Sequence, residues 1–588
     1  MGGIKLGVFE QTDLHRMHID QNTEIPAQPH NPNGIFSQQK DAKTILHWLF
    51  TLVGAFYLSF VIIGKQLIEI SYYDTIVNGT SHWELYCIIG LLSFLFFLCL
   101  LLFVSKNGKA LFHIKTEQGK LSFRFFCSIS IPVLLLYLLF WLIDYPGGIS
   151  PDNNNQWQQI TLLTFNDHHP AFHTFLLLWL TKLCNSYSFI ILAQIVAFAC
   201  GVGYLASTLD SWGFPRWCVI LTSVILALGF STRHILQYAW KDTALSLFFL
   251  FFLSHMINIF LSHGSWLQSP SHWLSSAILL VCITLVRHNA FFFTAPLLAL
   301  SFFFFSKKAC LKLGLIVCIL IVIVKGPVYS YYGVKPAPDT YRELVGLPMT
   351  ILSAVYGEAP REQIPDDLYD FFSSEFADHR LFREKHVLGD FNSVKWSFDF
   401  SEEKMQKLPP LELLKMTWNA MRSNGQLALY SVVELTDMVY DPCENEGWIA
   451  GVNSSPWIDE TPSPSYDQVP NMHAWTRSKD SDLFWNVSVR PLADRCLNHP
   501  ITRYFTSNYG FLLLVMLLSC YVSFQKVHGW RSLWLVFPIM IYNFGTMLLL
   551  CGNDGRFFHF NCLAAYPIAL VLLSTQSQTK PISKTTLQ

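Results

Sequence analysis

Charged residues are scarce in this sequence. Asp, Glu, Lys and Arg make up 14% of its 588 residues, whereas about a quarter of a typical soluble protein is charged. Hydrophobic residues make up 52%, and with 49 Phe and 18 Trp they are too many for a polar surface to cover. These proportions exclude an ordinary set of soluble domains and predict a protein whose solvent is largely the lipid bilayer.

Other features are missing too, and each absence removes a class of function. The net charge of −1 offers no basic face to nucleic acid. None of the 14 cysteines forms a CxxC pair, so neither a zinc ribbon nor a redox motif is indicated. No Walker A lysine motif supports nucleotide-driven transport. The segment before residue 43 is polar, unlike a signal peptide, so we expect the first apolar run to remain as a membrane span.

Long apolar runs are abundant. A helix needs about 20 apolar residues to cross the hydrocarbon core of a membrane. About twelve stretches reach or approach that length, at 43–63, 83–104, 123–143, 187–207, 215–231, 243–262, 273–286, 288–305, 309–325, 506–524, 533–551 and 560–576. The charged break at 287–289 leaves open whether 273–305 is two spans or one bent span. The predicted fold class is all-α, a polytopic membrane protein with about twelve transmembrane helices.

The distribution of lysine and arginine predicts the sidedness of these spans, because short loops rich in these residues stay in the cytoplasm. Basic residues gather at 105–124, at 306–312 and in the tail. We therefore expect a multi-pass protein of the cell membrane with cytoplasmic termini, 1–42 and 577–588. Threading then places outside the segments 144–186, 232–242, 326–505 and 552–559, with Arg287 and the sequons at Asn78, Asn453 and Asn486.

This topology divides the chain into parts. A membrane module, 43–325, contains the first external loop, 144–186, and helices at 506–576 complete the membrane part. Between them, 326–505 has ordinary soluble character, and we expect a mixed external module, inserted between the late helices, with amphipathic helical stretches such as 411–439. Cys443 and Cys496 lie in this module, where a disulfide and two unpaired thiols are equally open.

The first external loop carries the densest group of titratable residues. It begins DYPGGISPD, which ends at Asp152, and later reads NDHHP at 166–170. Proline and glycine hold Asp152 close to the membrane surface, and Pro170 suits the start of a helix whose positive end faces Asp167, His168 and His169. The pattern predicts a site of acid and imidazole groups. The alternative is a loop of helix caps and interfacial Trp anchors.

Three polar insertions lie on the same predicted face: WKD at 240–242, RHN at 287–289 and NDGR at 553–556. Charges at span ends are costly unless they are paired or functional. We therefore predict that Lys241, Arg287 and Arg556 hold an anion such as a phosphate, with Asp242 beside them. For each cation taken singly, snorkelling or pairing with a neighbouring acid is an equally open alternative.

A metal centre on His168, His169 and His173 has less support. Imidazoles four residues apart can share a helix face, but Pro170 interrupts the register and no HExxH pattern occurs. We predict no metal-ligating residues and no definite cofactor, and the acids of the loop leave a divalent cation open.

These motifs resemble those of the C-type glycosyltransferases, multi-span enzymes that include protein O-mannosyltransferases and the lipid A aminoarabinose transferase. The shared pattern is an acid in the first large external loop, a proline element entering the next helix, and basic residues in later external turns. YPGGISPD, NDHHPAFHT, AWKD, LVRHN and NDGRFF are similar to an uncharacterised bacterial membrane family grouped with that superfamily, over about 140–305 and 540–575. The superfamily usually pairs two acids in the loop, whereas three Asn follow Asp152, so Asp167 is the candidate for the second acid.

The resemblance implies a sugar donor linked to a polyprenyl phosphate, and an acceptor glycan, lipid or protein on the outer face of the membrane. Asp152 and Asp167 would be catalytic, with Asp152 as general base on an acceptor hydroxyl. The residues implied in substrate binding are His168, His169, Lys241, Asp242, Arg287 and Arg556, whose cations would stabilise the departing phosphate. The expected partners are the donor, membrane lipid and the acceptor.

Two other classes of function compete with this interpretation. A transporter or flippase of a lipid-linked or anionic substrate would line its path with intramembrane charges. The predicted charges cluster at one face instead, and no inverted repeat is evident. A structural scaffold that binds partners through 326–505 would leave the cluster in the first loop unexplained.

Overall fold

The computed structural model describes residues 32–76, 82–148, 150–337, 345–375, 379–395, 408–443, 484–497 and 499–576. By its contacts the chain divides into Met1–Phe50 and Thr51–Gln588. The described part of the first unit is the beginning of one helix, which continues into the second unit. The structure is 81% helical, and its described residues contain a single two-stranded sheet.

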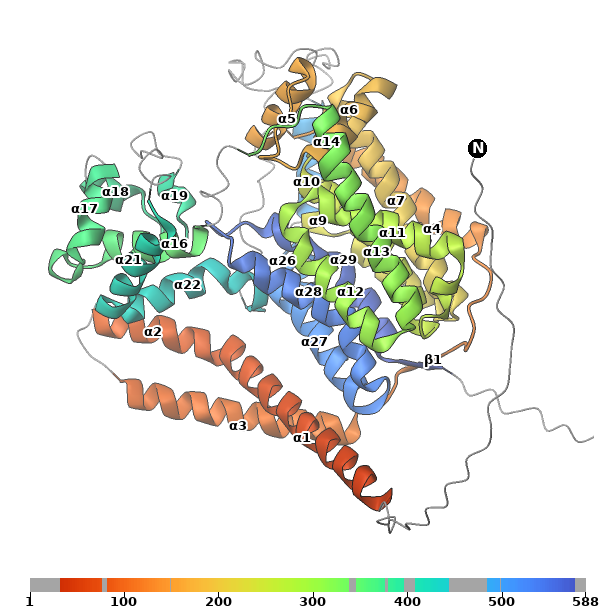
Figure 1. Cartoon of the computed structure of the whole chain (residues 1–588), viewed down its shortest axis with the longest axis horizontal. Helices are drawn as coiled ribbons and strands as arrows, with labels where there is room; N and C mark the ends of the chain where they lie inside the picture. The colour runs from red at the N-terminus through yellow and green to blue at the C-terminus, as the bar shows by residue number, and fades with distance from the viewer. Residues whose placement is uncertain are drawn as a thin grey trace, which may run out of the picture. The chain divides into compact units, whose positions relative to one another are not determined.

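The N-terminal half consists almost entirely of helices (Figure 1). In chain order they are α1 (Pro32–Ser59), the π-helical turn η1 (Phe60–Gly64), α2 (Lys65–Ile76), α3 (Trp83–Asn107), the strand β1 (Phe112–Ile114), α4 (Phe123–Ile143), α5 (Pro151–Leu162), α6 (Ala171–Leu183), α7 (Tyr187–Ser211), α8 (Arg216–Ala227), α9 (Phe230–Leu236), α10 (Lys241–Leu261), η2 (Ser265–Gln268), α11 (Pro270–Val286), η3 (His288–Ala290), α12 (Phe291–Phe304), α13 (Lys307–Ile323), η4 (Val324–Val328) and α14 (Tyr329–Tyr331).

The C-terminal half begins with the inserted module and returns to long helices. The described elements of the module are α16 (Gly346–Glu358), η5 (Arg361–Gln363), α17 (Asp366–Glu375), α18 (His379–Lys385), α19 (Asn392–Lys395), α21 (Pro410–Ser423), α22 (Gly425–Tyr440), η7 (Phe484–Val489) and α25 (Arg490–Leu497). Then follow α26 (Pro500–Ser507), α27 (Tyr509–Lys526), η8 (Gly529–Arg531), α28 (Ser532–Met547), η9 (Gly555–Phe558), α29 (His559–Leu572) and the strand β2 (Ser574–Gln576).

Eight helical segments are long and apolar enough to cross a membrane, among the residues that the structure describes. They are Thr44–Thr75, Trp83–Asn107, Phe123–Ile143, Tyr187–Ser211, Lys241–Leu261, Lys307–Tyr331, Tyr509–Lys526 and Gly555–Leu572. α8 and α9, which meet at 55°, would form a ninth span, and α6, α11 and the helix from His288 to Phe304 are apolar but shorter. The chain is therefore an all-α protein of membrane character. Each of the twelve predicted stretches is mostly helical, although 215–231 is divided between α8 and α9 and 560–576 ends in β2. The number of twelve spans stays a prediction.

The structure corrects two details of the predicted organisation and decides a third that the sequence left open. The interval 144–186, predicted as a loop, contains α5 and α6, because a capping box starts the first helix and 171–183 is an apolar helix. The described stretches of the module at 345–375, 379–395 and 408–443 are helical rather than mixed. The segment 273–305 is two helices, because α11 ends at Val286 and the backbone of Arg287 is extended. The sequons at Asn78 and Asn453 lie outside the described residues, and so do the side chains of Asn486 and Cys496.

The core of the bundle lies around α10 and α29. In the most apolar stretch of each of these two helical segments, 78% is buried. The corresponding share is 6% for α3 and 17% for the segment that contains α13. A helix that is apolar on all sides belongs either in a protein core or against lipid. α10 and α29 occupy the core, where Phe249 and Phe560 stack with ring centroids 3.9 Å apart. α3 and α13 leave most of their apolar side chains exposed, as helices that face lipid would.

The helices place two groups of segments at opposite ends of the bundle. At one end β1 and β2 pair in parallel, and the side-chain amide of Gln576 donates to the carbonyl of Leu261 at 2.8 Å. α10 runs from there to Lys241, and α4 runs from the region of β1 to Asp144. The basic loop 105–124 is therefore at the end opposite to Asp144 and Lys241. Which end faces the cytoplasm stays a prediction.

Candidate functional site

The site is built around the start of α5. Ser150 and Asn153 form a capping box, in which each side chain accepts from the other residue's backbone N–H. The side-chain amide of Asn153 also donates to the carbonyl of Ala239 at 2.9 Å, and the indole N–H of Trp240 donates to Ser150 Oγ at 2.7 Å. These bonds fix the first turn of α5, and with it Asp152, against the turn that precedes α10.

Lys241, the first residue of α10, joins two predicted site residues. Its Nζ donates to Asp152 Oδ2 at 3.2 Å and to His169 Nδ1 at 2.9 Å. His169 Nε2 lies 4.0 Å from Asp152 Oδ1, so the three side chains form a triangle. The acid and imidazole that the sequence predicted at one place do meet there, and Lys241 lies between them.

Arg556 approaches the same carboxylate from the start of the last helix. Its Nη1 lies 3.4 Å from Asp152 Oδ2, and its Nε lies 2.7 Å from Asp554 Oδ2 and 3.9 Å from Asp242 Oδ2. The guanidinium also lies over the Trp240 ring, 4.9 Å from the centroid. Arg556 therefore links Asp152 to Asp242, although the two positions are far apart in sequence.

Arg287 completes the network from the break between α11 and α12. It forms an ion pair with Asp242, which is 1% exposed, and its guanidinium lies over the Phe557 ring at 3.9 Å. Its Nε donates to Asn289 Oδ1 at 2.7 Å, and Asn289 donates to Thr546 Oγ1 at 2.8 Å. The three predicted cations thus belong to one connected network rather than to separate helix interfaces.

The charges of this network balance. Three cations, Lys241, Arg287 and Arg556, face three carboxylates, Asp152, Asp242 and Asp554. An anion that binds here must therefore displace a carboxylate from one of the cations. Asp152 is the most accessible of the three carboxylates, because its side chain is 26% exposed against 14% for Asp554 and 1% for Asp242.

Protonation follows from burial and from these charges. Burial by itself raises the pKa of the Asp152 carboxyl, but the charges of Lys241 and Arg556 outweigh it and hold that pKa well below its usual range. For His169, burial and then the charge of Lys241 lower the pKa to about 2. Asp152 is therefore ionised and His169 neutral at physiological pH, which allows His169 Nδ1 to accept from the ammonium group.

Asp167 and His168 lie beside this network and have other contacts. Asp167 Oδ1 accepts from the backbone N–H of Ala171 at the start of α6, and its Oδ2 lies 3.2 Å from Lys325 Nζ. The carbonyl of Asp167 pairs with His288 Nε2 at 3.1 Å. The His168 ring meets the His169 ring edge-on, at 4.7 Å between centroids. Asp167 thus has a structural partner and a capping role, and its catalytic role stays a prediction.

No arrangement for a metal ion occurs among the residues that the structure describes: no three His, Cys, Asp or Glu side chains are grouped as ligands. His173 lies buried in α6 and pairs with Gln156 Oε1 at 3.1 Å, and Gln156 donates to Thr174 at 3.0 Å.

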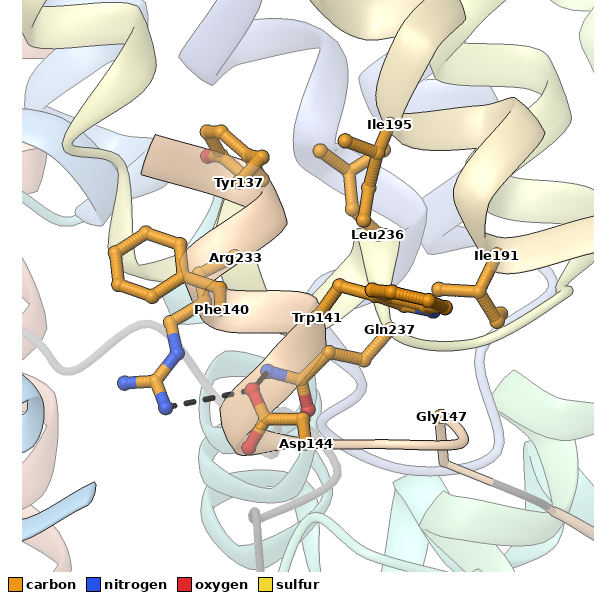
Figure 2. Close-up of a pocket in the computed structure, with 10 residues that line it drawn as sticks. All are labelled: Tyr137, Phe140, Trp141, Asp144, Gly147, Ile191, Ile195, Arg233, Leu236 and Gln237. Atoms are coloured by element: carbon orange, nitrogen blue, oxygen red, sulfur yellow. Dashed lines mark hydrogen bonds and ion pairs between the residues drawn. The ribbon is translucent and has the colours of Figure 1, made fainter. Parts of the chain in front are cut away.

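A second buried charge cluster holds the beginning of the first loop, and sequence reasoning missed it. Asp144 accepts from Gln237 and from Arg233, as Figure 2 shows, and lies 3.0 Å from Arg490 Nη2. Arg233 also lies 2.6 Å from Asp494. The cluster fixes the turn from Asp144 to Ser150, because Gly148 N–H donates to the carbonyl of Gln237 at 2.9 Å. Its sequence signal was Asp144 itself, the first letter of the DYPGG motif.

The inserted module contacts the turn that carries Asp554. The backbone N–H of Asn392 donates to the carbonyl of Cys551 at 3.1 Å, and Lys395 Nζ donates to Cys551 Sγ at 3.6 Å. Gly552 lies so close to the Asp390 carboxylate that a Cβ at that position would overlap it. The module therefore supports the segment that presents Asp554 and Arg556 to the network.

An apolar groove of about 490 Å³ lies among the described helices. α12, α16, α22 and α28 line it through side chains that include Phe292, Leu347, Val432, Phe537 and Phe544. Gly545 and Met547 of its wall flank Thr546, which bonds Asn289 and through it Arg287.

Together these features define the class of the protein as a helical membrane protein with a buried ionic site at one end of its bundle. Comparison of the chain with known protein families, with curated proteins and with solved structures found no match.

Proposed function

We propose that this protein is a membrane glycosyltransferase that moves a sugar from a polyprenyl-phosphate donor to an acceptor glycan, lipid or protein on the outer face of the membrane. The observation that carries the proposal is the meeting of Lys241, Arg556 and Arg287, from three distant segments, around the carboxylates of Asp152 and Asp242. The resemblance of the motifs to those of C-type glycosyltransferases supports the same function.

The donor is proposed to bind with its phosphate at the cations and its tail in the apolar groove. Lys241 and Arg556 are the more accessible cations, each with a side chain 16% exposed, and they would contact the phosphate directly. Arg287, behind Asp242, would add its charge from greater depth. Phosphate favours such cations because charge-assisted hydrogen bonds are strong away from bulk water. The groove beside Thr546 offers an isoprenoid chain an apolar surface.

The proposed reaction is a displacement at the anomeric carbon. Asp152 takes the proton from an acceptor hydroxyl, whose oxygen then forms the new bond to that carbon. The bond from the carbon to the phosphate oxygen breaks, and its electron pair leaves with the polyprenyl phosphate. Lys241 and Arg556 stabilise the charge that develops on this leaving group.

Donor binding would also prepare Asp152 for its role. A general base works best when its pKa lies near the working pH, whereas the charges of Lys241 and Arg556 hold the pKa of Asp152 far below it. A phosphate that takes over these two cations would offset their charge. The pKa of Asp152 would then rise toward neutral pH, so that the site would gain its base only when the donor is present.

Transfer of radiolabelled sugar tests the proposal. The purified protein in lipid would be incubated with a panel of polyprenyl-phosphate sugars and acceptor fractions extracted from membranes. We expect a labelled covalent product from at least one donor, and none when the same sugar is supplied as a nucleotide sugar. Failure of every donor to yield product, together with sugar-lipid movement across the membrane, would overturn the proposal.

Transport is the second candidate, and one observation favours it. Lys65 lies inside the first candidate span, 2.7 Å from Asp437 and 3.4 Å from Asp441, and all three side chains are buried. Intramembrane charges often mark the path of an ion or substrate. Counterflow of a lipid-linked substrate in proteoliposomes, without a covalent product, would establish transport, and its loss in Lys65→Met would place the path at this cluster.

A further inference from the structure

We propose that α21 of the inserted module lies in the surface of the membrane, with one of its faces in contact with lipid. The inference concerns an interaction surface, and it is independent of whether the protein is a transferase or a transporter. It rests on the exposure of four apolar side chains, on the basic residues beside them, and on the connection of α21 to a candidate membrane span.

The exposed stripe runs the length of α21. Leu411, Leu414, Trp418 and Met421 are 80%, 59%, 60% and 42% exposed. Their spacing of three, four and three residues puts them on one face of the helix. Another face of the same helix is used by the module itself, since Leu413, Met416 and Ala420 are buried. α21 therefore has an inner apolar face that packs and a second apolar face that nothing in the described structure covers.

Basic residues border the stripe. Lys415 and Arg422 each follow directly after a stripe residue and are exposed, so their side chains lie along one edge of the stripe, where the exposed Glu412 is the one acid. Trp418 lies in its middle. An apolar face with Trp and Leu, bordered by Lys or Arg, is the pattern of helices that lie in the plane of the membrane interface. The cations would reach the lipid phosphates while the apolar side chains enter the acyl boundary.

α21 is close in the chain to a segment that packs against the end of a candidate membrane span. Only Asn424 separates α21 from α22, and Tyr430 of α22 packs on Tyr72 and Tyr73 with ring centroids 4.7 and 6.4 Å apart. Both tyrosines lie at the end of the first candidate span, Thr44–Thr75. Tyrosine and tryptophan gather where spans leave the hydrocarbon. The α21–α22 junction therefore lies near the level of the interface.

Depth-dependent fluorescence quenching tests the proposal on the full chain in nanodiscs. The fluorescent amino acid acridonylalanine would replace Trp418 in one variant and, as a control, Glu384 of α18, which is 59% exposed. Leu91, 58% exposed on α3, would give the reference for a lipid-facing site. Lipids with a nitroxide at the headgroup or at two depths of the acyl chain would serve as quenchers. A probe at Leu411, on the same stripe, replaces the first if the Trp418 variant does not fold.

We expect quenching at 418 to be at least about threefold stronger than at 384, and strongest with the headgroup or shallow nitroxide, because interfacial helices lie about 5–10 Å below the surface. Quenching at 418 no greater than at 384 would overturn the proposal. A second result would also overturn it. If lipid nitroxides do not quench the probe at 418, and the probe becomes shielded as the protein concentration rises, a second copy of the protein covers the stripe.

Discussion

Among single residues, the proposed reaction depends most on Asp152, a carboxylate between two cations. Asp152→Asn keeps the size and most hydrogen bonds of the side chain but removes its basic lone pair and its charge. We predict a turnover lower by about 10²–10⁴-fold, the usual contribution of a general base. Donor affinity should be unchanged or higher, because Lys241 and Arg556 lose a competing carboxylate. Rates and donor binding of the purified variant check both parts.

Asp167→Asn is the matched control for this substitution. Its carboxylate pairs with Lys325 and caps α6, so the variant should keep most of its turnover. If Asp167→Asn were the inactive variant and Asp152→Asn transferred at a near-normal rate, the assignment of the base would be wrong even with the enzyme class correct.

Arg287 and Asp242 make a second prediction, about stability. Arg287→Ala leaves the buried carboxylate of Asp242 without its closest cation, and loss of one partner from a buried ion pair costs about 3–5 kcal/mol. In Arg287→Ala with Asp242→Asn both charges are gone, so most of that loss should be recovered. Thermal unfolding in detergent micelles measures the difference.

The double variant also separates stability from binding. If it recovers stability while donor binding stays weak, the charge of Arg287 acts on the donor phosphate, as we propose. A double variant as unstable as Arg287→Ala would show that the two residues do not stabilise each other.

At the scale of the element, the turn between α4 and α5 positions the site through a close approach of Gly148. A Cβ added there would overlap the Tyr238 ring. That ring stacks on Trp240 at 4.1 Å, and Trp240 bonds Ser150 and lies beneath Arg556. We predict that Gly148→Ala costs about 1–3 kcal/mol, as overpacking does, and weakens donor binding.

Gly314→Ala is the matched control, because nothing lies within 4 Å of a Cβ at that position. Both variants would be compared by thermal unfolding and by donor affinity. Equal stability and equal affinity in the two would contradict the role assigned to the turn.

Sequence patterns predicted the elements of this fold unevenly, for physical reasons. Long apolar runs become helices whatever their neighbours, so all twelve predicted stretches are mostly helical. The helix α5 was missed because it is polar. The start of α6 at Pro170 was predicted, but its course to Leu183 was not, because 144–186 was assigned as one external loop. The amphipathic stretch 411–439 became α21 and α22, but its break at Asn424 and its exposed stripe depend on tertiary packing.

The site shows the same division. Lys241, Arg287 and Arg556 were predicted to meet because charges at span ends are costly alone, and the structure joins them. Their pairing with particular carboxylates was not predictable, because it depends on the rotation of each helix. The cluster around Asp144 was missed because its members come from segments without a recognisable motif: Arg233 and Arg490 pair with Asp144, and Asp494 pairs with Arg233.

At the scale of the whole molecule, the ion pairs predict a topology. Lys241 Nζ and Arg556 Nη1 both lie within 3.4 Å of Asp152 Oδ2. The three segments that carry these residues must therefore share one side of the membrane. Single cysteines near 150, 240, 450 and 555 should react with a membrane-impermeant reagent added outside intact cells. Sites near 115 and 310, at the opposite end in the predicted topology, should not react until the membrane is opened. Labelling of 150 and 555 from opposite sides would remove the basis of a shared site.

The central claim is that these cations bind a lipid-linked phosphate, and native mass spectrometry of the lipid that copurifies with the protein tests it most directly. We predict that the wild-type protein retains a polyprenyl-phosphate lipid and that Arg556→Gln, which loses a cation facing Asp152, retains little of it. The control Arg216→Gln changes an exposed arginine that pairs with Asp210, a residue outside the site, and should retain the lipid like the wild type. Absence of any polyprenyl phosphate from the wild-type protein, or equal retention by the Arg556 variant, would contradict the account.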